Sequence, residues 1–286
     1  MAPVRISIVT PNFNMSAFLG ETIRSVMANL TPADEYFVVD GGSTDASVDI
    51  IRRHENDLTG WISEPDRGYA DALAKGFARA TGDVLCWINS GDILLSGAFD
   101  MVRNIFAKGK VDLIFGDDFY IDEAGRIIRF SRGYVGDISS AMLYGGWTPL
   151  QDACFWTRDL YERVGGIDRD LRFAADYDLF LRMVRGSRTR HVPLAFSAFR
   201  RHGGQKSIAD QTPYAQEREQ VRLREVRAIG EAPLAGALKR MIHLNANRVR
   251  SRLAPRLRCR SDLTGRPIGE FPCASYWPRL HAVDAR

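Results

Sequence analysis

The turn "WINSGD", residues 87–92, follows an apolar run and carries one carboxylate, that of Asp92. Carboxylate oxygens are hard ligands of the kind that Mg²⁺ and Mn²⁺ prefer. Asp92 could therefore hold a divalent cation in an enzyme that handles phosphate groups. Aspartate is also common in turns, where its side chain bonds to the nearby backbone. These residues alone leave both roles open.

A second polar turn, "DGGSTD", places Asp40 directly after another apolar run. Its carboxylate could accept hydrogen bonds from ribose hydroxyls or a base edge, and the two glycines would let a ligand approach the backbone. Ser43 and Asp45 stand where a helix N-cap is expected, so capping explains them but not Asp40. Because neither GxGxxG nor GxxxxGK[ST] occurs at this turn, dinucleotide and P-loop sites are weakly supported.

The stretch "SEPDRGYADALAKGF" adds Asp66, Arg67 and Asp71 in a loop that enters a helix. Asp66 and Arg67 could form a surface ion pair, which contributes little to stability. At the rim of a nucleotide site, Arg67 would instead contact phosphate or base.

Short β-rich runs alternate with helix-length amphipathic segments from the N-terminus to about residue 118. This alternation predicts an α/β protein whose parallel strands are covered by helices on both faces. In open sheets of this type, ligands bind beyond the carboxyl ends of the strands. The clusters TPNFN, DGGSTD, SEPDRG and NSGD each follow one of the first four expected strands. Their side chains should therefore meet at one edge of the sheet.

Five motifs, in order, resemble those of the inverting family-2 glycosyltransferases, which transfer a sugar from a nucleotide diphosphate-sugar to an acceptor. They are ISIVTPNFN, VVDGGSTD, SEPDRGYADALAKGF, GDVLCWINSGD and FAADYDLFLRM. The resemblance covers roughly residues 4–207 and implies a GT-A fold, a Rossmann-type mixed α/β sheet flanked by helices. Each motif alone is weak, but five motifs in register are specific.

The resemblance also implies a donor site and a metal site. Nucleotide-sugar contacts are implied for Thr10, Pro11, Asn12, Asp40, Asp66, Arg67, Asp71 and Ser90. NSGD stands where the family has its DxD-like motif, so Asp92 would bind Mn²⁺ or Mg²⁺. Because Asn89 and Gly91 stand where the family has more acids, the cation would also rely on diphosphate oxygens, waters and the candidate ligand His202. We therefore expect weak metal binding without the donor and firmer binding with it.

The motif FAADYDLFLRM offers a general base for the acceptor hydroxyl, which an inverting displacement needs opposite the leaving group. By resemblance this base is Asp176, with Ala175 in place of the more usual acidic neighbour, and Asp178 is the alternative. An aspartate in the first turn of a helix is also stabilised by the helix dipole. Capping alone could therefore account for Asp176.

The loop FRRHGGQKS, residues 199–207, follows another expected strand. The resemblance makes His202 a candidate metal ligand, and an ordinary surface histidine is the alternative. Arg200, Arg201 and Lys206 are candidate phosphate partners.

The segment GGWTPLQDACFW resembles the acceptor side of the family's site. Trp147 could stack on a sugar ring, and Gln151 and Asp152 could bond its hydroxyls. For Phe155 and Trp156, buried packing is the better explanation.

The composition is that of a globular protein, with 45% hydrophobic and 26% charged residues. The four cysteines show no CxxC spacing and no disulfide pattern, which favours a reducing cytoplasm. No signal-peptide pattern is visible, and no apolar run reaches the ~18 to 20 residues of a membrane-spanning helix. We expect a cytoplasmic protein without a nucleic-acid partner.

The net charge of +4 is unevenly distributed, because residues 218–266 contain 13 Lys and Arg against 4 Asp and Glu. Peripheral contact with the inner face of a membrane would explain this surplus. A solvated helix face would explain it equally well. We predict a GT-A domain over residues 1–212 and a basic helical extension with an irregular tail over residues 213–286, including a second basic helix over residues 234–253.

These observations favour a metal-assisted inverting glycosyltransferase that acts on a glycan or lipid-linked acceptor in cell-surface polysaccharide synthesis, with UDP as the expected donor nucleotide. A catalytically weak nucleotide-sugar-binding module of the same fold is the alternative, since NSGD holds one acid. A nucleotidyltransferase is less well supported, because no Gly-rich triphosphate loop with Arg or Lys follows the first strand.

Overall fold

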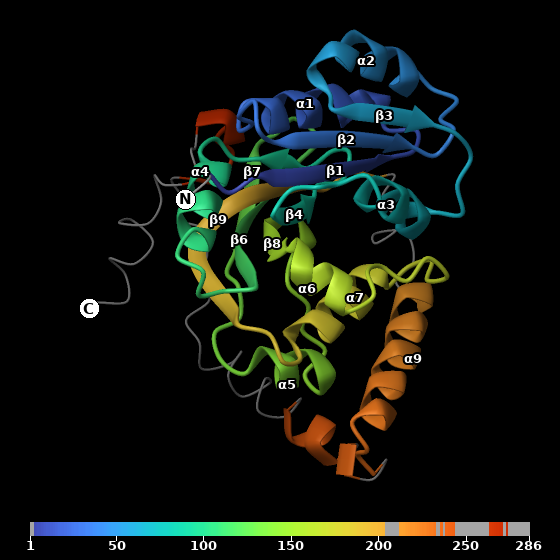
Figure 1. The fold of residues 1–286 in the computed structure, drawn as a ribbon, viewed down its shortest axis with the longest axis vertical. Coiled ribbons are helices and arrows are strands. Elements are labelled where there is room, and N and C mark those ends of the chain that lie inside the picture. The colour runs from blue at the N-terminus through green and yellow to red at the C-terminus, as the bar shows by residue number, and fades with distance from the viewer. Residues whose placement is uncertain are drawn as a thin grey trace.

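The computed structural model describes residues 3–203, 212–232, 235–236, 238–243, 263–270 and 273. These residues form a nine-stranded mixed sheet with helices on both faces (Figure 1). The strand order is β3-β2-β1-β4-β8-β6-β9-β5, and β7 pairs with β6 outside this order.

The described elements have the following bounds. The strands are β1 Ile6–Asn12, β2 Glu35–Asp40, β3 Gly60–Ser63, β4 Val84–Trp87, β5 Ile93–Leu94, β6 Leu113–Ile121, β7 Ile127–Ser131, β8 Cys154–Thr157 and β9 Thr189–Arg200. The α-helices are α1 Ser16–Met27, α2 Ser47–Arg53, α3 Tyr69–Phe77, α4 Ala98–Phe106, α5 Ile138–Leu143, α6 Arg158–Arg163, α7 Ala175–Val184 and α9 Thr212–Ala228. Short 3₁₀ turns are η1 Glu55–Asp57, η2 Gln151–Ala153 and η3 Ile268–Glu270.

The first four major strands are parallel, which confirms the prediction from the alternating pattern. Their register places Asn12, Asp40 and Ser63 side by side at one edge of the sheet. β8 then pairs antiparallel with both β4 and β6, and β6 pairs parallel with β9, so the sheet as a whole is mixed. The two-residue strand β5 was not predicted, because two residues show no periodicity.

Both faces of the sheet are apolar, so the core has two layers. α1, α2 and α4 cover one face, and α3, α5, α6 and α7 cover the other. On β1, Ile8 belongs to the first layer and its neighbour Val9 to the second, as expected when successive side chains point to opposite faces.

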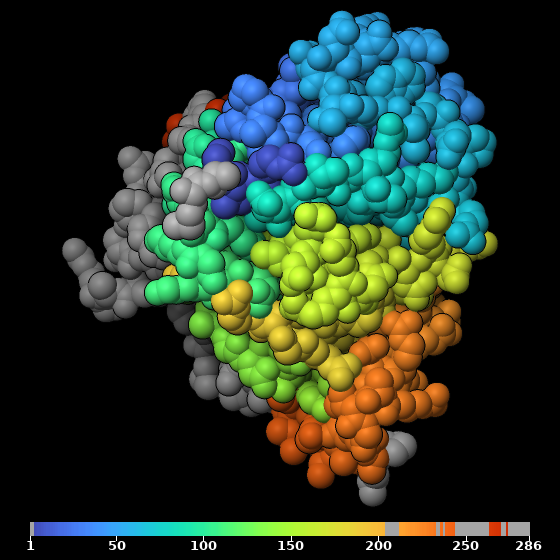
Figure 2. Space-filling view, in the orientation of Figure 1, coloured from blue at the N-terminus to red at the C-terminus, as the bar shows by residue number. Residues whose placement is uncertain are grey.

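The helix α9 lies against the segment that carries α7, where Figures 1 and 2 show orange against yellow. Val221 and Val226 of α9 are buried in the same apolar layer as α7. The predicted domain boundary at residue 212 therefore precedes a helix that shares this layer.

Residues 263–270 and 273 return to the opposite face of the sheet. There Leu263, Ile268 and Cys273 are buried in the layer that contains α1 and α4. Most of the predicted second basic helix and most of the tail lie outside the described residues.

None of the helices in the described part of the chain combines the length and the apolar character that crossing a bilayer requires.

Candidate active site

Asp40, at the end of β2, is fully buried and organises its own turn. Its carboxylate accepts hydrogen bonds from the side chains of Asn12, Ser43 and Ser63 at 2.6, 2.5 and 2.7 Å. The backbone N–H groups of Gly42 and Ser43 also donate to it, at 3.2 and 2.9 Å. Burial raises the pKa of Asp40, but these bonds outweigh burial and hold the pKa below its usual value. Contact between Asp40 and a nucleoside stays a prediction.

Asp66 faces the same turn across Gly41. A Cβ atom on Gly41 would lie 2.6 Å from the Asp66 carboxylate, so a larger residue here would displace that carboxylate. The other Asp66 oxygen accepts the N–H of Gly68 at 2.8 Å. The structure thus brings Asp40 and Asp66 together around one glycine.

Thr10 and Pro11 are buried in β1, one strand away from Asp40. The Thr10 hydroxyl lies 3.0 Å from the Tyr36 hydroxyl. Ser90, in the turn after β4, donates to the Pro11 carbonyl at 3.0 Å. These bonds join β1 to β2 and to the turn after β4, while donor contact by Thr10, Pro11 or Ser90 stays a prediction.

Asp71, in the first turn of α3, is buried among cationic side chains. Arg169 donates two hydrogen bonds to its Oδ1 at 2.8 and 2.5 Å, and the Lys75 ammonium lies 3.6 Å from Oδ2. Burial raises the pKa of Asp71, but the bonds from Arg169 and Arg67 and the charges of Arg169 and Lys75 bring it below its usual value. The Arg67 side chain is 63% exposed, and its guanidinium lies 3.7 Å from the Asp71 carboxylate. Arg67 is therefore at the protein surface, beside Asp71.

Asp92 is buried in the NSGD turn and keeps one oxygen unpaired. Its Oδ1 accepts the Arg200 backbone N–H at 3.0 Å, whereas Oδ2 has no hydrogen-bond partner among the described residues. Burial, followed by the charge of Asp152, raises the pKa of Asp92 well above its usual value. Gly91 has a φ of 115°, at which an acid would be strained.

Two more buried acids lie within electrostatic range of Asp92. Asp118 of β6 was not identified from the sequence, and Asp152 of η2 was expected only to bind the acceptor. The Oδ2 of Asp118 and both oxygens of Asp152 lack a hydrogen-bond partner in the described part of the chain. Burial raises the pKa of Asp152 to about 6, and burial with the charges of Asp152 and Asp92 raises that of Asp118 well above its usual value. The paired acids in "FGDDFY" were the available signal for Asp118.

The unpaired Oδ2 of Asp92 fits one ligand position of Mn²⁺ or Mg²⁺. Across the described ranges, no group of three or more His, Cys, Asp or Glu side chains is arranged to hold a metal. The His202 ring packs on Phe18 with centroids 5.3 Å apart, and burial lowers its pKa, which favours the neutral form that binds metals. A cation at Asp92 would therefore take most ligands from the donor and from water.

Arg200 does not face a phosphate site, so this prediction was wrong. Its side chain is fully buried, and its guanidinium donates to the Gly91 carbonyl at 2.8 Å. It also donates to the carbonyls of Asp122 and Glu123 at 3.1 and 2.8 Å and to the Glu21 carboxylate at 2.5 Å. Arg200 thus supports the NSGD turn from inside the protein.

The neighbouring Arg201 is exposed, because the chain leaves β9 after Arg200. Sequence alone could not show which of two adjacent arginines points inward. Lys206, the third candidate phosphate partner, lies outside the described residues.

Asp176, the predicted base, lies in the first turn of α7 and is partly exposed. Its Oδ1 accepts the Tyr177 N–H at 2.7 Å, and burial raises its pKa to about 6. The Glu217 carboxylate accepts the backbone N–H of Ala174, two residues before Asp176, at 2.6 Å. The Tyr69 hydroxyl accepts the N–H of Asp176 itself at 3.2 Å. Glu217 and Tyr69 therefore satisfy two N–H groups at the start of α7, and Asp176 Oδ1 satisfies a third, so capping accounts for one of its two oxygens.

Asp178, the alternative base, is fully buried in an ion-pair cluster. Arg182 donates to its Oδ2 at 3.0 and 2.5 Å, and Arg224 of α9 pairs with its Oδ1. Because both oxygens are engaged, the interpretation of Asp178 as a base was wrong.

The predicted acceptor residues lie between β7 and β8. Trp147 packs against Phe115 and Tyr134, with ring centroids 5.4 and 5.5 Å apart. The side-chain amide of Gln151 and the carboxylate of Asp152 are buried without hydrogen-bond partners in the described ranges. Phe155 and Trp156 are fully buried, as predicted.

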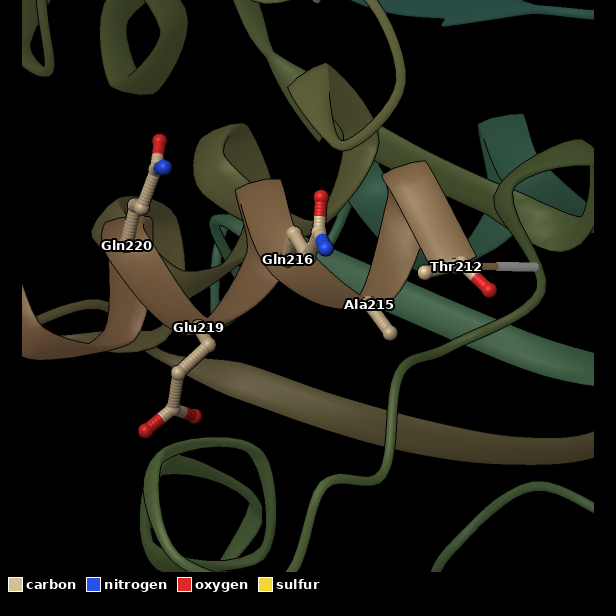
Figure 3. A pocket seen from close by; sticks show the side chains of 5 residues that line it. All are labelled: Thr212, Ala215, Gln216, Glu219 and Gln220. Atoms are coloured by element: carbon tan, nitrogen blue, oxygen red, sulfur yellow. The ribbon is translucent and has the colours of Figure 1, made fainter.

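Figure 3 shows a surface depression along α9. It is lined by Thr212, Ala215, Gln216, Glu219 and Gln220 and contains none of the predicted site residues.

Comparison with known sequences identifies relatives. Residues 7–163, more than half of the chain, match the model of "Glycosyl transferase family 2". An uncharacterized glycosyltransferase of Mycobacterium tuberculosis is 33% identical over 181 residues, which is 62% of this chain and 68% of that protein. A PGL/p-HBAD biosynthesis glycosyltransferase of Mycobacterium bovis is 26% identical over 213 residues, covering 71% and 80% of the two chains.

Solved structures of similar fold include S. aureus TarS 1–349 in complex with UDP-GlcNAc, with a TM-score of 0.65 and 16% identity over 86% of this chain and 73% of that chain. The mannosyltransferase PcManGT from Pyrobaculum calidifontis was solved in complex with GDP-Man and Mn²⁺. It matches with a TM-score of 0.60 and 18% identity over 89% of this chain and 79% of that chain. These likenesses confirm the predicted GT-A-like fold. The match to the family model and the M. tuberculosis relative show that the chain belongs to glycosyl transferase family 2 and is a glycosyltransferase.

Proposed function

We propose that the protein is an inverting glycosyltransferase in which Asp176 is the general base and a nucleotide diphosphate-sugar, with UDP as its nucleotide, is the donor. One observation carries this proposal. Asp176 is partly exposed and burial raises its pKa to about 6, whereas Asp178 is enclosed by arginines that engage both its oxygens. A carboxylate with a pKa just below neutrality can accept a proton at physiological pH.

In the proposed reaction, Asp176 takes the proton from the acceptor hydroxyl while that oxygen forms a bond to the anomeric carbon of the donor sugar. The bond between the anomeric carbon and the β-phosphate oxygen breaks on the opposite face, so the configuration inverts and the nucleoside diphosphate leaves. A divalent cation, when bound, would neutralise charge on the leaving diphosphate. Asp92 would hold that cation through its unpaired Oδ2, in a turn supported by Arg200.

The donor proposal is supported by the complexes of structural relatives. TarS was solved with UDP-GlcNAc, and PcManGT with GDP-Man and Mn²⁺. The residues that we propose to surround the nucleotide-sugar are Thr10, Pro11, Asn12, Asp40, Asp66, Arg67, Asp71 and Ser90.

We infer a glycan or lipid-linked acceptor bound at Trp147, Gln151 and Asp152. Buried amide and carboxylate groups that have no hydrogen-bond partner among the described residues suit the hydroxyls of a sugar. The name of the M. bovis relative, which refers to PGL/p-HBAD biosynthesis, supports a role in building a cell-surface glycan.

We also infer peripheral contact with the inner face of a membrane. In the helical stretch 238–243, Leu238, Met241 and Ile242 are 52, 55 and 56% exposed and share one face by their spacing. The sequence that follows, residues 244–262, contains six arginines and one acid. An apolar helix face beside basic residues suits an anionic lipid surface.

The test is a transfer assay with UDP-, GDP- and dTDP-sugars, with Mn²⁺ or with a chelator. Wild-type protein should release nucleoside diphosphate with one donor class, and metal removal should abolish release. Asp176→Asn should keep the donor-induced rise in melting temperature but lose about 10²- to 10⁴-fold in turnover.

Asp159→Asn, at an exposed position in α6, is the matched control and should behave as wild type. Equal turnover by wild type and Asp176→Asn would refute the base assignment. Donor binding without any turnover by wild type would favour the alternative of a nucleotide-sugar-binding module.

A further inference from the structure

Glu217 of α9 holds the backbone that leads into α7. Its carboxylate accepts hydrogen bonds from the N–H groups of Arg172, Phe173 and Ala174 at 2.9, 2.7 and 2.6 Å. A single carboxylate therefore binds three successive backbone donors, the last of them two residues before Asp176. Hydrogen bonds to a charged acceptor are stronger than neutral ones, so this contact fixes the path of the chain.

A second contact holds the same segment from α3. The Tyr69 hydroxyl accepts the Asp176 N–H at 3.2 Å and donates to the Phe173 carbonyl at 3.1 Å. The backbone around Asp176 is thus held by α3 on one side and by α9 on the other. α3 follows directly on the loop of Asp66 and Arg67.

α9 itself is anchored by contacts that do not involve Glu217. Arg224 pairs with Asp178, and Glu225 pairs with Arg185 at 2.5 Å. Val221 is buried in the layer that contains α7. Removing the Glu217 carboxylate should therefore leave α9 docked and affect mainly the segment 172–174.

α9 also contacts the acceptor loop. Arg218, next to Glu217, donates to the Gly146 carbonyl at 3.1 Å, one residue before Trp147. Its guanidinium lies 5.8 Å from the ring of Tyr177, the neighbour of Asp176. One face of α9 therefore touches both the segment of the proposed base and the loop of the proposed acceptor site.

We propose that Glu217 is a positioning residue for Asp176, which it holds through the backbone of residues 172–174. α9 lies beyond residues 7–163, which match the family model. This inference rests on the proposed role of Asp176 as the base. In Glu217→Gln the amide keeps one acceptor oxygen but turns an NH₂ group toward the remaining backbone N–H donors, so the segment relaxes. A shift of about 1 Å in a catalytic group can cost on the order of 100-fold in rate.

The experiment compares Glu217→Gln with Glu219→Gln in full-length protein. Both variants replace a carboxylate on α9, but Glu219 bonds to Arg222 and Arg240 and lines the depression in Figure 3. Glu217→Gln should lower kcat roughly 10- to 100-fold, with the donor KM and the nucleotide-induced rise in melting temperature unchanged. Glu219→Gln should match wild type.

A double-mutant cycle separates positioning from general stability. If Glu217 acts through Asp176, Glu217→Gln should cost little further rate once Asp176→Asn is present. Glu217→Asp keeps the negative charge and should recover part of the rate. If Glu217→Gln does not fold, Glu217→Asp takes its place in the cycle.

Three results would overturn the inference: an unchanged kcat in Glu217→Gln, a loss of nucleotide binding together with kcat, or additive effects in the cycle. Failure of the proposed function is distinguishable from these, because it would leave wild type inactive or Asp176→Asn fully active.

Discussion

At the scale of single residues, Asp176 and Asp178 are two positions apart in the same helix and yet have opposite surroundings. Asp178 is enclosed by Arg182 and Arg224, and both its oxygens are engaged. Asp176 is buried enough for its pKa to rise to about 6, and its Oδ1 accepts the Tyr177 N–H at 2.7 Å. The environment, and not the residue type, decides which of the two carboxylates is reached from solvent.

This difference predicts a pH dependence. A general base works only when deprotonated, and a raised pKa moves its protonation upward in pH. The kcat/KM of the wild type should therefore fall with acid below about pH 6, instead of near the ordinary value of ~4 for an aspartate. Initial rates between about pH 4 and pH 8 measure the acid limb of the pH profile, and circular dichroism at each pH checks that the protein stays folded. A limb near pH 4 would contradict the role of burial at Asp176.

At the scale of elements, the NSGD turn depends on β9. Arg200 at the end of β9 donates to the Gly91 carbonyl, and its backbone N–H binds the Asp92 carboxylate. The turn that carries the proposed metal ligand is thus held by a strand 108 residues later in the chain. Gly91 adds a backbone conformation that other residues rarely adopt.

Arg200→Met should therefore destabilise the protein strongly. The substitution leaves three carbonyls and the half-exposed Glu21 carboxylate without their donor, and each buried polar group left unsatisfied typically costs about 1–3 kcal/mol. Arg201→Met, at the exposed neighbour, should change the free energy of unfolding by less than about 0.5 kcal/mol. Denaturant unfolding of both variants measures the difference. Similar stabilities would show that the buried network contributes little.

At the scale of the whole molecule, the described C-terminal helices include one surface packed on the protein and one exposed apolar surface. α9 turns Glu217 and Arg224 toward α7, whereas Leu238, Met241 and Ile242 in the next helical stretch are exposed. Burying those side chains in a lipid surface would bring the proposed acceptor loop, which Arg218 contacts, toward the membrane.

Replacing Leu238 and Ile242 by Glu should reduce binding to vesicles that contain anionic lipid, because charges enter the apolar face. Wild type should sediment with anionic vesicles at low salt, and high salt should weaken this binding, since screening reduces the attraction of the basic segment. Ile128→Glu, at an exposed position on β7, is the control and should sediment as wild type does. Equal sedimentation of all three proteins would argue against the membrane contact.

The sequence by itself determined the α/β alternation, the parallel order of the first strands and the edge at which polar turns collect. These features follow from local periodicity and from turn residues such as the glycines of DGGSTD. The positions of Asp40, Asp66 and Asp92 at strand ends could be predicted for the same reason.

Only the tertiary structure decided which side chains near those turns are buried and bonded within the protein and which can reach a ligand. The inward direction of Arg200, the proximity of Asp118 to Asp92 and the bonds of Glu217 to residues 172–174 join segments that are far apart in the sequence. Such contacts depend on how strands and helices pack, which short-range patterns do not encode. For the same reason, the choice between Asp176 and Asp178 required the position of α9, since Arg224 comes from that helix.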